Sequence, residues 1–126
     1  MTVLDASALL ALINNEQGSD VVAASIIDSS VGAANLAEVV GKLVDVGVDA
    51  AGLRTLLGTA RVTIEPVTAA DGEMAGALRG INGGRQLSLG DRCCLALALR
   101  SNPPEVLTAD RAWAALGLPI TVRLLR

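Results

Sequence analysis

The sequence predicts an α/β fold, a sandwich of helices around a largely parallel sheet. Short apolar runs that suit buried strands alternate along the chain with segments whose apolar residues recur at helical spacing. Alternation of this kind is typical of strand–helix–strand units, which build parallel sheets. The 126 residues match one ordinary domain, and 52% hydrophobic residues suffice for a full core. We therefore expect a single domain over residues 1–126.

In the first half of the chain, two strands and four helices are expected. Polar residues that favour helix N-termini, namely Asp5 or Ser7, Ser19 or Asp20, and Asp49, stand before three of the helical segments. The strands are expected at Thr2–Leu4 and Val31–Ala33, and the helices at Ala6–Asn14, Val21–Asp28, Ala34–Val46 and Asp49–Thr59.

The second half should add three strands and three helices. Thr68 and Ser88 are placed to cap helices, and Asn82-Gly83-Gly84 has the composition of a loop. The strands are expected at Val62–Ile64, Glu105–Leu107 and Ile120–Leu124, and the helices from Thr68 to about Arg79, at Gly90–Arg100 and at Ala109–Leu116.

The composition excludes several kinds of chemistry. Histidine is absent, which removes catalytic triads with a histidine base, histidine-ligated zinc sites and histidine proton shuttles. General acid–base work would fall to carboxylates, to Lys42 or to metal-bound water. Phe and Tyr are absent and Trp113 is the only aromatic residue, so base stacking on aromatic platforms is nearly excluded.

The net charge of −3 argues against a protein that binds nucleic acid by charge alone. If four of the 13 acidic residues held metal, however, nine would remain against 10 basic ones. The acidic composition is therefore compatible with a metal-dependent nuclease.

Cys93 and Cys94 are the only cysteines, and they stand side by side in a helical pattern. This spacing fits neither a zinc site nor an ordinary disulfide framework, so we expect buried, reduced thiols. No basic and apolar leader precedes the strand at Thr2, and the longest apolar run, Cys93–Leu99, is too short to span a bilayer. We expect a soluble, cytoplasmic protein with no membrane segment.

Four acids stand at or near the places where predicted strands and helices meet. Asp5 and Asp110 follow strands, Asp91 opens a helix, and Glu38 lies one turn into a helix, on the same face as Asn35. In an open α/β sheet the C-terminal ends of the strands converge on one crevice, where ligands bind. Carboxylates with hydroxyl and amide neighbours are hard oxygen donors, which suit Mg²⁺ or Mn²⁺.

Each acid taken singly also has a structural explanation. Helix N-caps would explain Asp5 and Asp110, a capping box with Ser88 would explain Asp91, and an i,i+4 pair with Lys42 would explain Glu38. Together, however, clustered like charges raise one another's pKa and are costly unless a cation neutralises them. The conjunction of the four therefore indicates a metal site.

Four motifs resemble those of PIN-domain ribonucleases, most closely the VapC-type toxins of bacterial toxin–antitoxin pairs. They span nearly the whole chain in the family's order, and they are Leu4-Asp5-Ala6-Ser7, Asn35-Leu36-Ala37-Glu38-Val39, Ser88-Leu89-Gly90-Asp91 with Ala96-Leu97-Ala98, and Leu107-Thr108-Ala109-Asp110-Arg111-Ala112-Trp113. The resemblance implies a three-layer α/β/α sandwich with a mainly parallel five-stranded sheet, formed by a single PIN-like domain over residues 1–126.

The resemblance also implies a function. It implies endonucleolytic cleavage of RNA with Mg²⁺ or Mn²⁺, an antitoxin protein that occludes the site, and a homodimer. The mean hydropathy of +0.53 independently favours apolar surface that a partner covers.

Residue roles follow from the matched motifs. We expect Asp5, Asp91 and Asp110 to hold metal directly, and Glu38 to bind metal or to orient the attacking water. The expected supporting residues are Ser7, Asn35 and Thr108 as hydrogen-bonding partners of these acids, and Arg85, Arg92 and Arg111 as contacts to RNA phosphates. Ordinary solvated surface charge explains each of the three arginines equally well.

Other functions remain open at this stage. The chain could be a catalytically silent PIN-like interaction module, or a PIN nuclease in RNA maturation rather than a toxin. Response-regulator receivers and haloacid-dehalogenase-type phosphatases do not fit, because the first motif, Asp5-Ala6-Ser7, lacks a second acid and Lys42 lies mid-chain on a helix.

Overall fold

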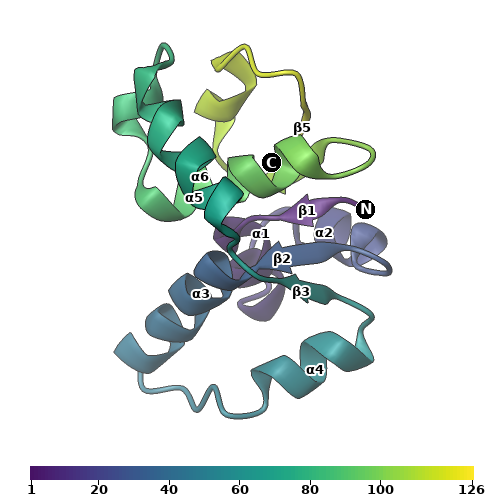
Figure 1. Cartoon of the computed structure of the whole chain (residues 1–126). Helices are drawn as coiled ribbons and strands as arrows, with labels where there is room; N and C mark the ends of the chain where they lie inside the picture. The colour runs from purple at the N-terminus through teal and green to yellow at the C-terminus, as the bar shows by residue number, and fades with distance from the viewer.

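All five strands of the molecule are parallel and form one sheet in the order β3-β2-β1-β4-β5 (Figure 1). The computed structural model describes the whole chain, residues 1–126. The predicted strands are confirmed, with every bound within one residue of the expected position: β1 Val3–Leu4, β2 Ser30–Gly32, β3 Thr63–Glu65, β4 Glu105–Thr108 and β5 Thr121–Leu124.

Six α-helices and three short 3₁₀ turns connect the strands. Their bounds are α1 Ala6–Ile13, α2 Ser19–Ser25, α3 Ala33–Asp45, α4 Leu53–Thr59, α5 Ala69–Ala77 and α6 Leu89–Arg100, with turns η1 Leu78–Gly80, η2 Gly84–Gln86 and η3 Arg111–Ala115. The molecule is thus the predicted three-layer α/β/α sandwich.

Three of the predicted helices differ from expectation by more than two residues at one end, or in helix type. The Asp49 carboxylate accepts the N–H of Ala51 (2.9 Å), but this bond closes a local turn, and α4 starts only after Gly52. Helix α2 starts at Ser19 and ends at Ser25, and the left-handed backbone of Asp28 (φ 62°) is incompatible with a longer helix. The segment Ala109–Leu116 contains only the 3₁₀ turn η3.

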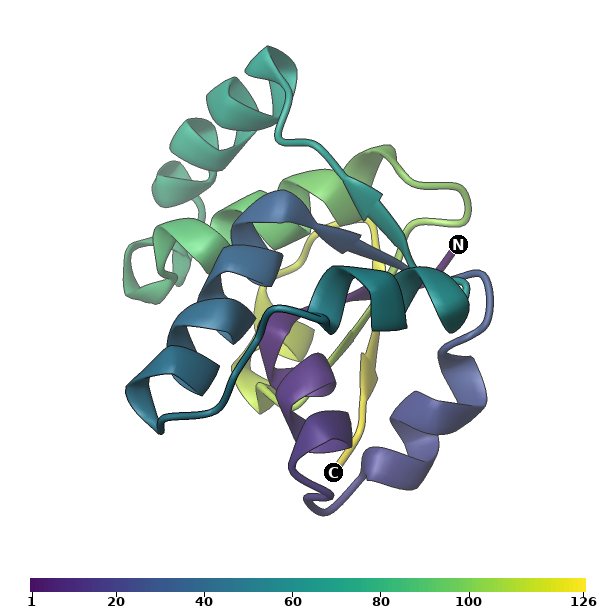
Figure 2. The same cartoon turned by 90° about the horizontal axis from the view of Figure 1, so that it is seen from below.

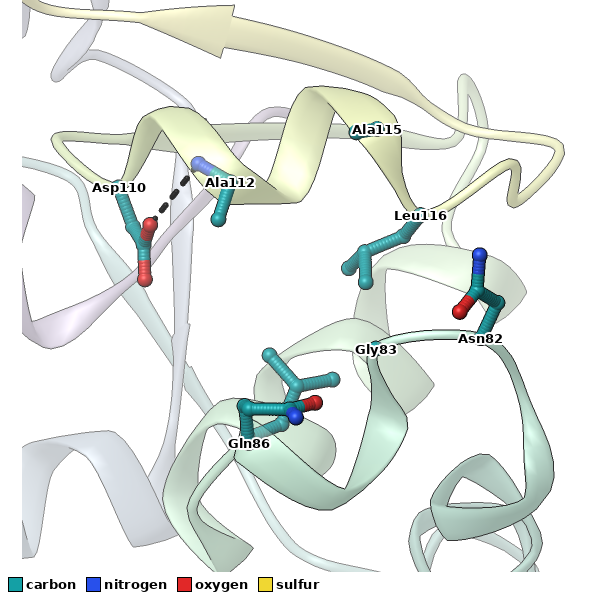
Figure 3. A pocket seen from close by; sticks show the side chains of 8 residues that line it. Asn82, Gly83, Gln86, Asp110, Ala112, Ala115 and Leu116 are labelled. Carbon is teal, nitrogen blue, oxygen red and sulfur yellow. Dashed lines mark hydrogen bonds between the residues drawn. The ribbon is translucent and has the colours of Figure 1, made fainter.

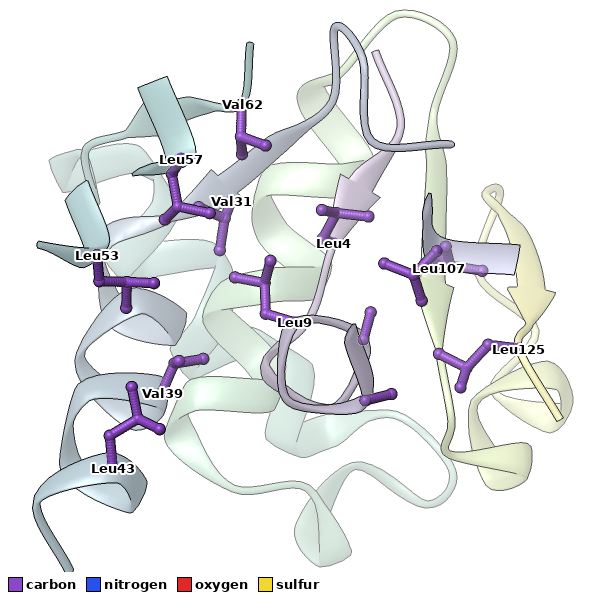
Figure 4. Packing of buried hydrophobic residues seen from close by; sticks show 13 residues of the cluster. Leu4, Leu9, Val31, Val39, Leu43, Leu53, Leu57, Val62, Leu107 and Leu125 are labelled. Atoms are coloured by element: carbon purple, nitrogen blue, oxygen red, sulfur yellow. The ribbon is translucent and has the colours of Figure 1, made fainter. Parts of the chain in front are cut away.

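The two faces of the sheet build two separate apolar cores. Neighbouring strand residues point to opposite faces. Leu4 and Leu107 therefore join a core with α1–α4, and Val3 and Val106 join a core with α6 and Trp113. Figure 4 shows the first core, and Figure 2, seen from below Figure 1, shows α1, α3 and α4 in front of it.

The two cysteines are free thiols, as predicted, but only Cys94 is buried; Cys93 is half-exposed on the surface of α6. Burial raises the pKa of the Cys94 thiol well above its ordinary value, so the thiol stays protonated and inert. None of the helices is long and apolar enough to cross a membrane.

Candidate functional site

Three adjacent strands deliver the candidate residues to one edge of the sheet. Because β1, β2 and β4 are parallel neighbours, their carboxyl ends emerge together. Asp5 follows β1 directly, Thr108 ends β4, and α3 with Asn35 and Glu38 begins immediately after β2. The backbone N–H of Asp5 donates to the carbonyl of Leu107 (3.2 Å), which fixes the first acid against the end of β4.

Asp5 is a buried carboxylate with only neutral partners. Its side chain caps α1, as predicted, by accepting the N–H of Ala8 (2.9 Å). The Ser7 hydroxyl donates to Oδ1 (2.6 Å) and the Thr108 hydroxyl to Oδ2 (2.5 Å). Burial nevertheless raises the pKa of Asp5, and the nearby charge of Asp91 raises it further. The ionised form is therefore held in place but not neutralised.

Glu38 is held against the first turn of α6 by an amide. The buried Asn35 side chain donates through Nδ2 to Glu38 Oε1 (2.8 Å) and to the carbonyl of Gly90 (3.0 Å). A Cβ atom at Gly90 would lie only 2.3 Å from Glu38 Oε1, so glycine is required for this close approach. Burial is the main cause of the raised pKa of Glu38, and the charges of Asp91 and Asp5 raise this pKa further.

Asp91 is the third member of this group. It forms the predicted capping box with Ser88: the Asp91 carboxylate accepts the Ser88 N–H (3.0 Å), and the Ser88 hydroxyl accepts the Asp91 N–H (3.1 Å). Its charge acts on both Asp5 and Glu38. These three acids, which we call the acid cluster, therefore lie within one another's electrostatic field.

Asp110 stands at the border of the acid cluster. Its backbone N–H donates to the Thr108 hydroxyl (3.0 Å), the same group that binds Asp5. Its exposed carboxylate caps η3 by accepting the N–H of Ala112 (3.0 Å) and lines one end of a pocket (Figure 3). The predicted fourth ligand is thus linked to the site through Thr108.

No basic side chain neutralises these acids. The four ion pairs of the molecule all use other carboxylates: Arg61–Asp28, Arg100–Asp71, Arg123–Glu105 and Arg126–Glu16. Lys42 lowers the pKa of Glu38, but its effect is smaller than that of burial. The acid cluster is therefore a concentration of negative charge that no ion pair of the chain neutralises.

A sequence profile of the PIN domain matches residues 2–118 of the chain. The chain belongs to the PIN domain family. Among solved structures, it is similar to a chain of a "Toxin-antitoxin complex from Klebsiella pneumoniae", with a TM-score of 0.74 and 20% identity over 100% of this chain and 98% of that chain. At this identity the likeness concerns the fold. None of the curated proteins is significantly similar to the sequence.

PIN nucleases generally use divalent metal ions, and the donors of this PIN domain suit one. Mg²⁺ prefers carboxylate oxygens and is commonly held by only one or two of them, with water and substrate phosphates completing its shell. No three acids approach closely enough to form a complete ligand set by themselves. The buried Oδ1 of Asn35 has no hydrogen-bond partner, which leaves one further oxygen unused at this edge. The donor chemistry of the PIN domain thus fits a partly hydrated Mg²⁺ or Mn²⁺.

The three predicted arginines of the PIN domain lie in different surroundings. Arg92 is buried, and its Nη1 donates to the carbonyl of Ala75 on α5 (2.7 Å). A guanidinium held between two helices is not presented to a ligand, which corrects the prediction for Arg92. Arg85 on η2 and Arg111 on η3 are exposed and make no ion pair.

Some features of the site carry no clear signal in the sequence. Gly90 is a poor helix former in the first turn of α6, and this is the one hint of its close contact with Glu38. Asn82 and Gln86 line the pocket beside Asp110, yet their segment is recognisable in the sequence only as a loop.

Proposed function

We propose that this PIN domain is a metal-dependent endoribonuclease that acts as the toxin of a toxin–antitoxin pair. The observation that carries the proposal is the acid cluster, three carboxylates without an ion-pair partner at the carboxyl edge of the sheet, of which Asp5 is buried and Glu38 and Asp91 are half-buried. Members of the family are generally nucleases, and phosphodiester cleavage uses a divalent ion held by carboxylates. The proposal treats residues 1–126 as one catalytic domain.

Asp5, Glu38, Asp91 and Asp110 are the residues proposed to hold Mg²⁺ or Mn²⁺. When bound, the ion supplies Lewis-acid stabilisation of the charge that develops on the phosphate. Ser7, Thr108 and Asn35 keep the carboxylates in position through the hydrogen bonds described above.

Glu38 has a second proposed role as the group that orients the attacking water and accepts its proton. It is less buried than Asp5, and Asn35 occupies only Oε1, which leaves Oε2 free to face a ligand. Its raised pKa makes it a stronger base than an ordinary glutamate at the pH of the cell.

The proposed partners are an RNA substrate, an antitoxin protein and a second copy of the chain, in the cytoplasm. The similar solved structure comes from a toxin–antitoxin complex, which supports the antitoxin. Apolar side chains gather on the surface at the ends of α1 and α3 and on α4, where a partner would cover them. They include Ile13, Val44, Val46, Val48 and Leu56.

The proposal is tested by cleavage of a structured RNA in Mg²⁺, in Mn²⁺ and in EDTA. Asp5→Asn and Asp91→Asn keep the shape of the side chain and remove its charge, so each should lower cleavage at least about a hundredfold. Asp45→Asn, at an exposed acid on α3, is the matched control and should cleave as the wild type does.

Different outcomes would contradict different parts of the proposal. Cleavage that persists in EDTA would exclude the metal, and a fully active Asp91→Asn protein would leave Asp91 a capping residue only. A wild type that binds its partner but cleaves no RNA would indicate a silent PIN-like interaction module. Cleavage without growth arrest in the producing cell would indicate a role in RNA maturation.

A further inference from the structure

A pocket of about 330 Å³ opens beside Asp110, between η3 and the loop that carries η2 (Figure 3). In the figure, Ala112 and Leu116 extend from η3 on one side and Gln86 lies on the other. Asp110 stands at one end of the pocket and Asn82 at the opposite end. The volume lies at the lower end of the range for small-molecule sites.

The walls of this pocket are apolar and its rim is polar. Leu87, Leu116, Ala112 and Ala115 supply aliphatic surface. The amide side chains of Asn82 and Gln86 are exposed and make no hydrogen bond within the protein, so all their donors and acceptors are available. Asp110 adds a further acceptor, because only its Oδ1 is used in capping η3.

The loop that forms one side of the pocket packs closely against its neighbours. Gly83 has φ +83°, and a Cβ atom there would lie 3.3 Å from Leu116 Cδ2, so the loop rests directly on η3. A Cβ at Gly84 would overlap the carbonyl of Leu78, so the loop also rests on η1. The loop is thus packed against Leu116 on one side and against η1 on the other.

The pocket shares one residue, Asp110, with the proposed catalytic group. Asp110 belongs to both, and its N–H shares the Thr108 hydroxyl with Asp5. Arg85 and Arg111, both exposed, are neighbours in sequence of the lining residues Gln86 and Asp110. An RNA whose phosphate lies at the acid cluster would therefore have an adjoining base within reach of the pocket.

We propose that this pocket binds one unstacked nucleobase next to the scissile phosphate and so sets the sequence preference of the enzyme. The assignment rests on the proposed ribonuclease function. Aliphatic walls enclose the ring, because the chain offers no exposed aromatic residue for stacking. Asn82 and Gln86 read the hydrogen-bonding edge, as amide side chains do with bases, and the Asp110 acceptor favours a base with an amino group.

The first test uses nucleosides, which carry the base without a phosphate, and needs neither metal nor cleavage. Adenosine, cytidine, guanosine and uridine are titrated into the ¹⁵N-labelled full chain in EDTA while the side-chain amide signals of Asn82 and Gln86 are followed. Saturable chemical-shift changes are expected. The affinity for uridine should be about fivefold lower than that for adenosine, because uridine has no amino group to donate a hydrogen bond to Asp110.

Two variants separate the pocket from general surface binding. Gln86→Ala removes one of the two amide side chains proposed to bind the base, and it should lower the affinity for adenosine about fivefold. Ala115→Leu fills the pocket and should abolish saturation, whereas Gln17→Ala, at an exposed glutamine on the α1–α2 connection, should change nothing. Absence of saturable shifts in the wild type, or equal affinities in all three variants, overturns the proposal.

The second test maps cleavage sites in an RNA pool of random sequence. Wild type and Gln17→Ala should share a preference for one base beside the cut, and Gln86→Ala should still cleave but with that preference lost. An unchanged preference in Gln86→Ala overturns the pocket assignment while leaving the nuclease intact. Failure of the proposed function shows itself differently, as a wild type that cuts no RNA although the nucleosides bind.

Discussion

Asp5 and Asp71 are two buried aspartates at the beginning of helices. They differ in that a basic side chain pairs with Asp71 and none pairs with Asp5. Asp71, in the first turn of α5, accepts from Arg100 Nε (2.8 Å) and Nη2 (3.0 Å) and from the N–H of Thr68 (3.1 Å). The bonds from Arg100 lower its pKa. Asp5 is just as buried but has neutral partners only, and its pKa is raised.

This difference is the basis for proposing Asp5 as a metal ligand while Asp71 has a structural role. Burial, capping and hydrogen bonding are common to both, so none of these properties identifies the site. What distinguishes Asp5 is that it makes no ion pair, and neither do Glu38 and Asp91. Carboxylates in this state are relieved by a proton or by a cation from outside, and the second is what the proposed metal site would supply.

The largest expected effect on stability comes from breaking the ion pair of Asp71. Asp71→Asn removes the charge that binds Arg100 and weakens the capping box with Thr68, so it should lower the free energy of unfolding by about 2 kcal/mol. This loss is smaller than that expected for a fully buried ion pair, because the Arg100 side chain is 40% exposed and solvent screens the pair. Urea unfolding at pH 7 in EDTA measures it.

Asp28→Asn is the matched control, because Asp28 pairs with Arg61 at the surface. This exposed pair should contribute less than about 0.5 kcal/mol. Equal destabilisation by the two substitutions would show that the Asp71 pair contributes no more than a surface contact. Asp71 would then not be an example of a buried acid stabilised by an ion pair, with which Asp5 is compared.

A smaller effect on the free energy of unfolding is expected from a change of pH. Its sign differs between Asp5 and Asp71. The pKa of Asp71 is lowered on folding, so its contribution to stability is present above the ordinary value of 3.8 and is lost as pH falls through the folded pKa. The pKa of Asp5 is raised, so its contribution is present below 3.8 and is lost as pH rises through the folded pKa.

Metal-free Asp5→Asn should therefore become more stable relative to wild type as pH rises from below 3.8 towards neutral. Asn caps a helix as well as Asp does, and the Thr108 hydroxyl can turn to accept from its amide. Asp71→Asn should show the opposite trend. Unfolding curves of both variants and wild type at pH 3 to 7 in EDTA measure these trends, and parallel trends would contradict the account.

Features that depend on neighbours in the sequence were predictable. The alternation of strands and helices, the caps by Asp5, Thr68 and Ser88, and the convergence of parallel strands all follow from local patterns. The acids could be nominated because three of them stand at the ends or beginnings of these elements.

Features that depend on packing between distant segments were not predictable. The burial of Arg92 follows from the contact of α6 with α5, and Asp71 finds Arg100 29 residues away. The contact of Glu38 with Gly90 joins α3 to α6, and Asp49 fails to start a helix because its side chain closes a turn instead. These contacts between distant segments cannot be predicted from the spacing of residues in the sequence.

The most direct test of the acid cluster is the stabilisation of the folded protein by Mn²⁺, measured by urea unfolding against metal concentration. A cation that binds only the folded chain should raise the unfolding free energy by about 2.7 kcal/mol at a hundred times its Kd. We expect this gain in wild type and in Asp71→Asn, and its loss in Asp5→Asn. An equal gain in Asp5→Asn, or none in wild type, would contradict this expectation.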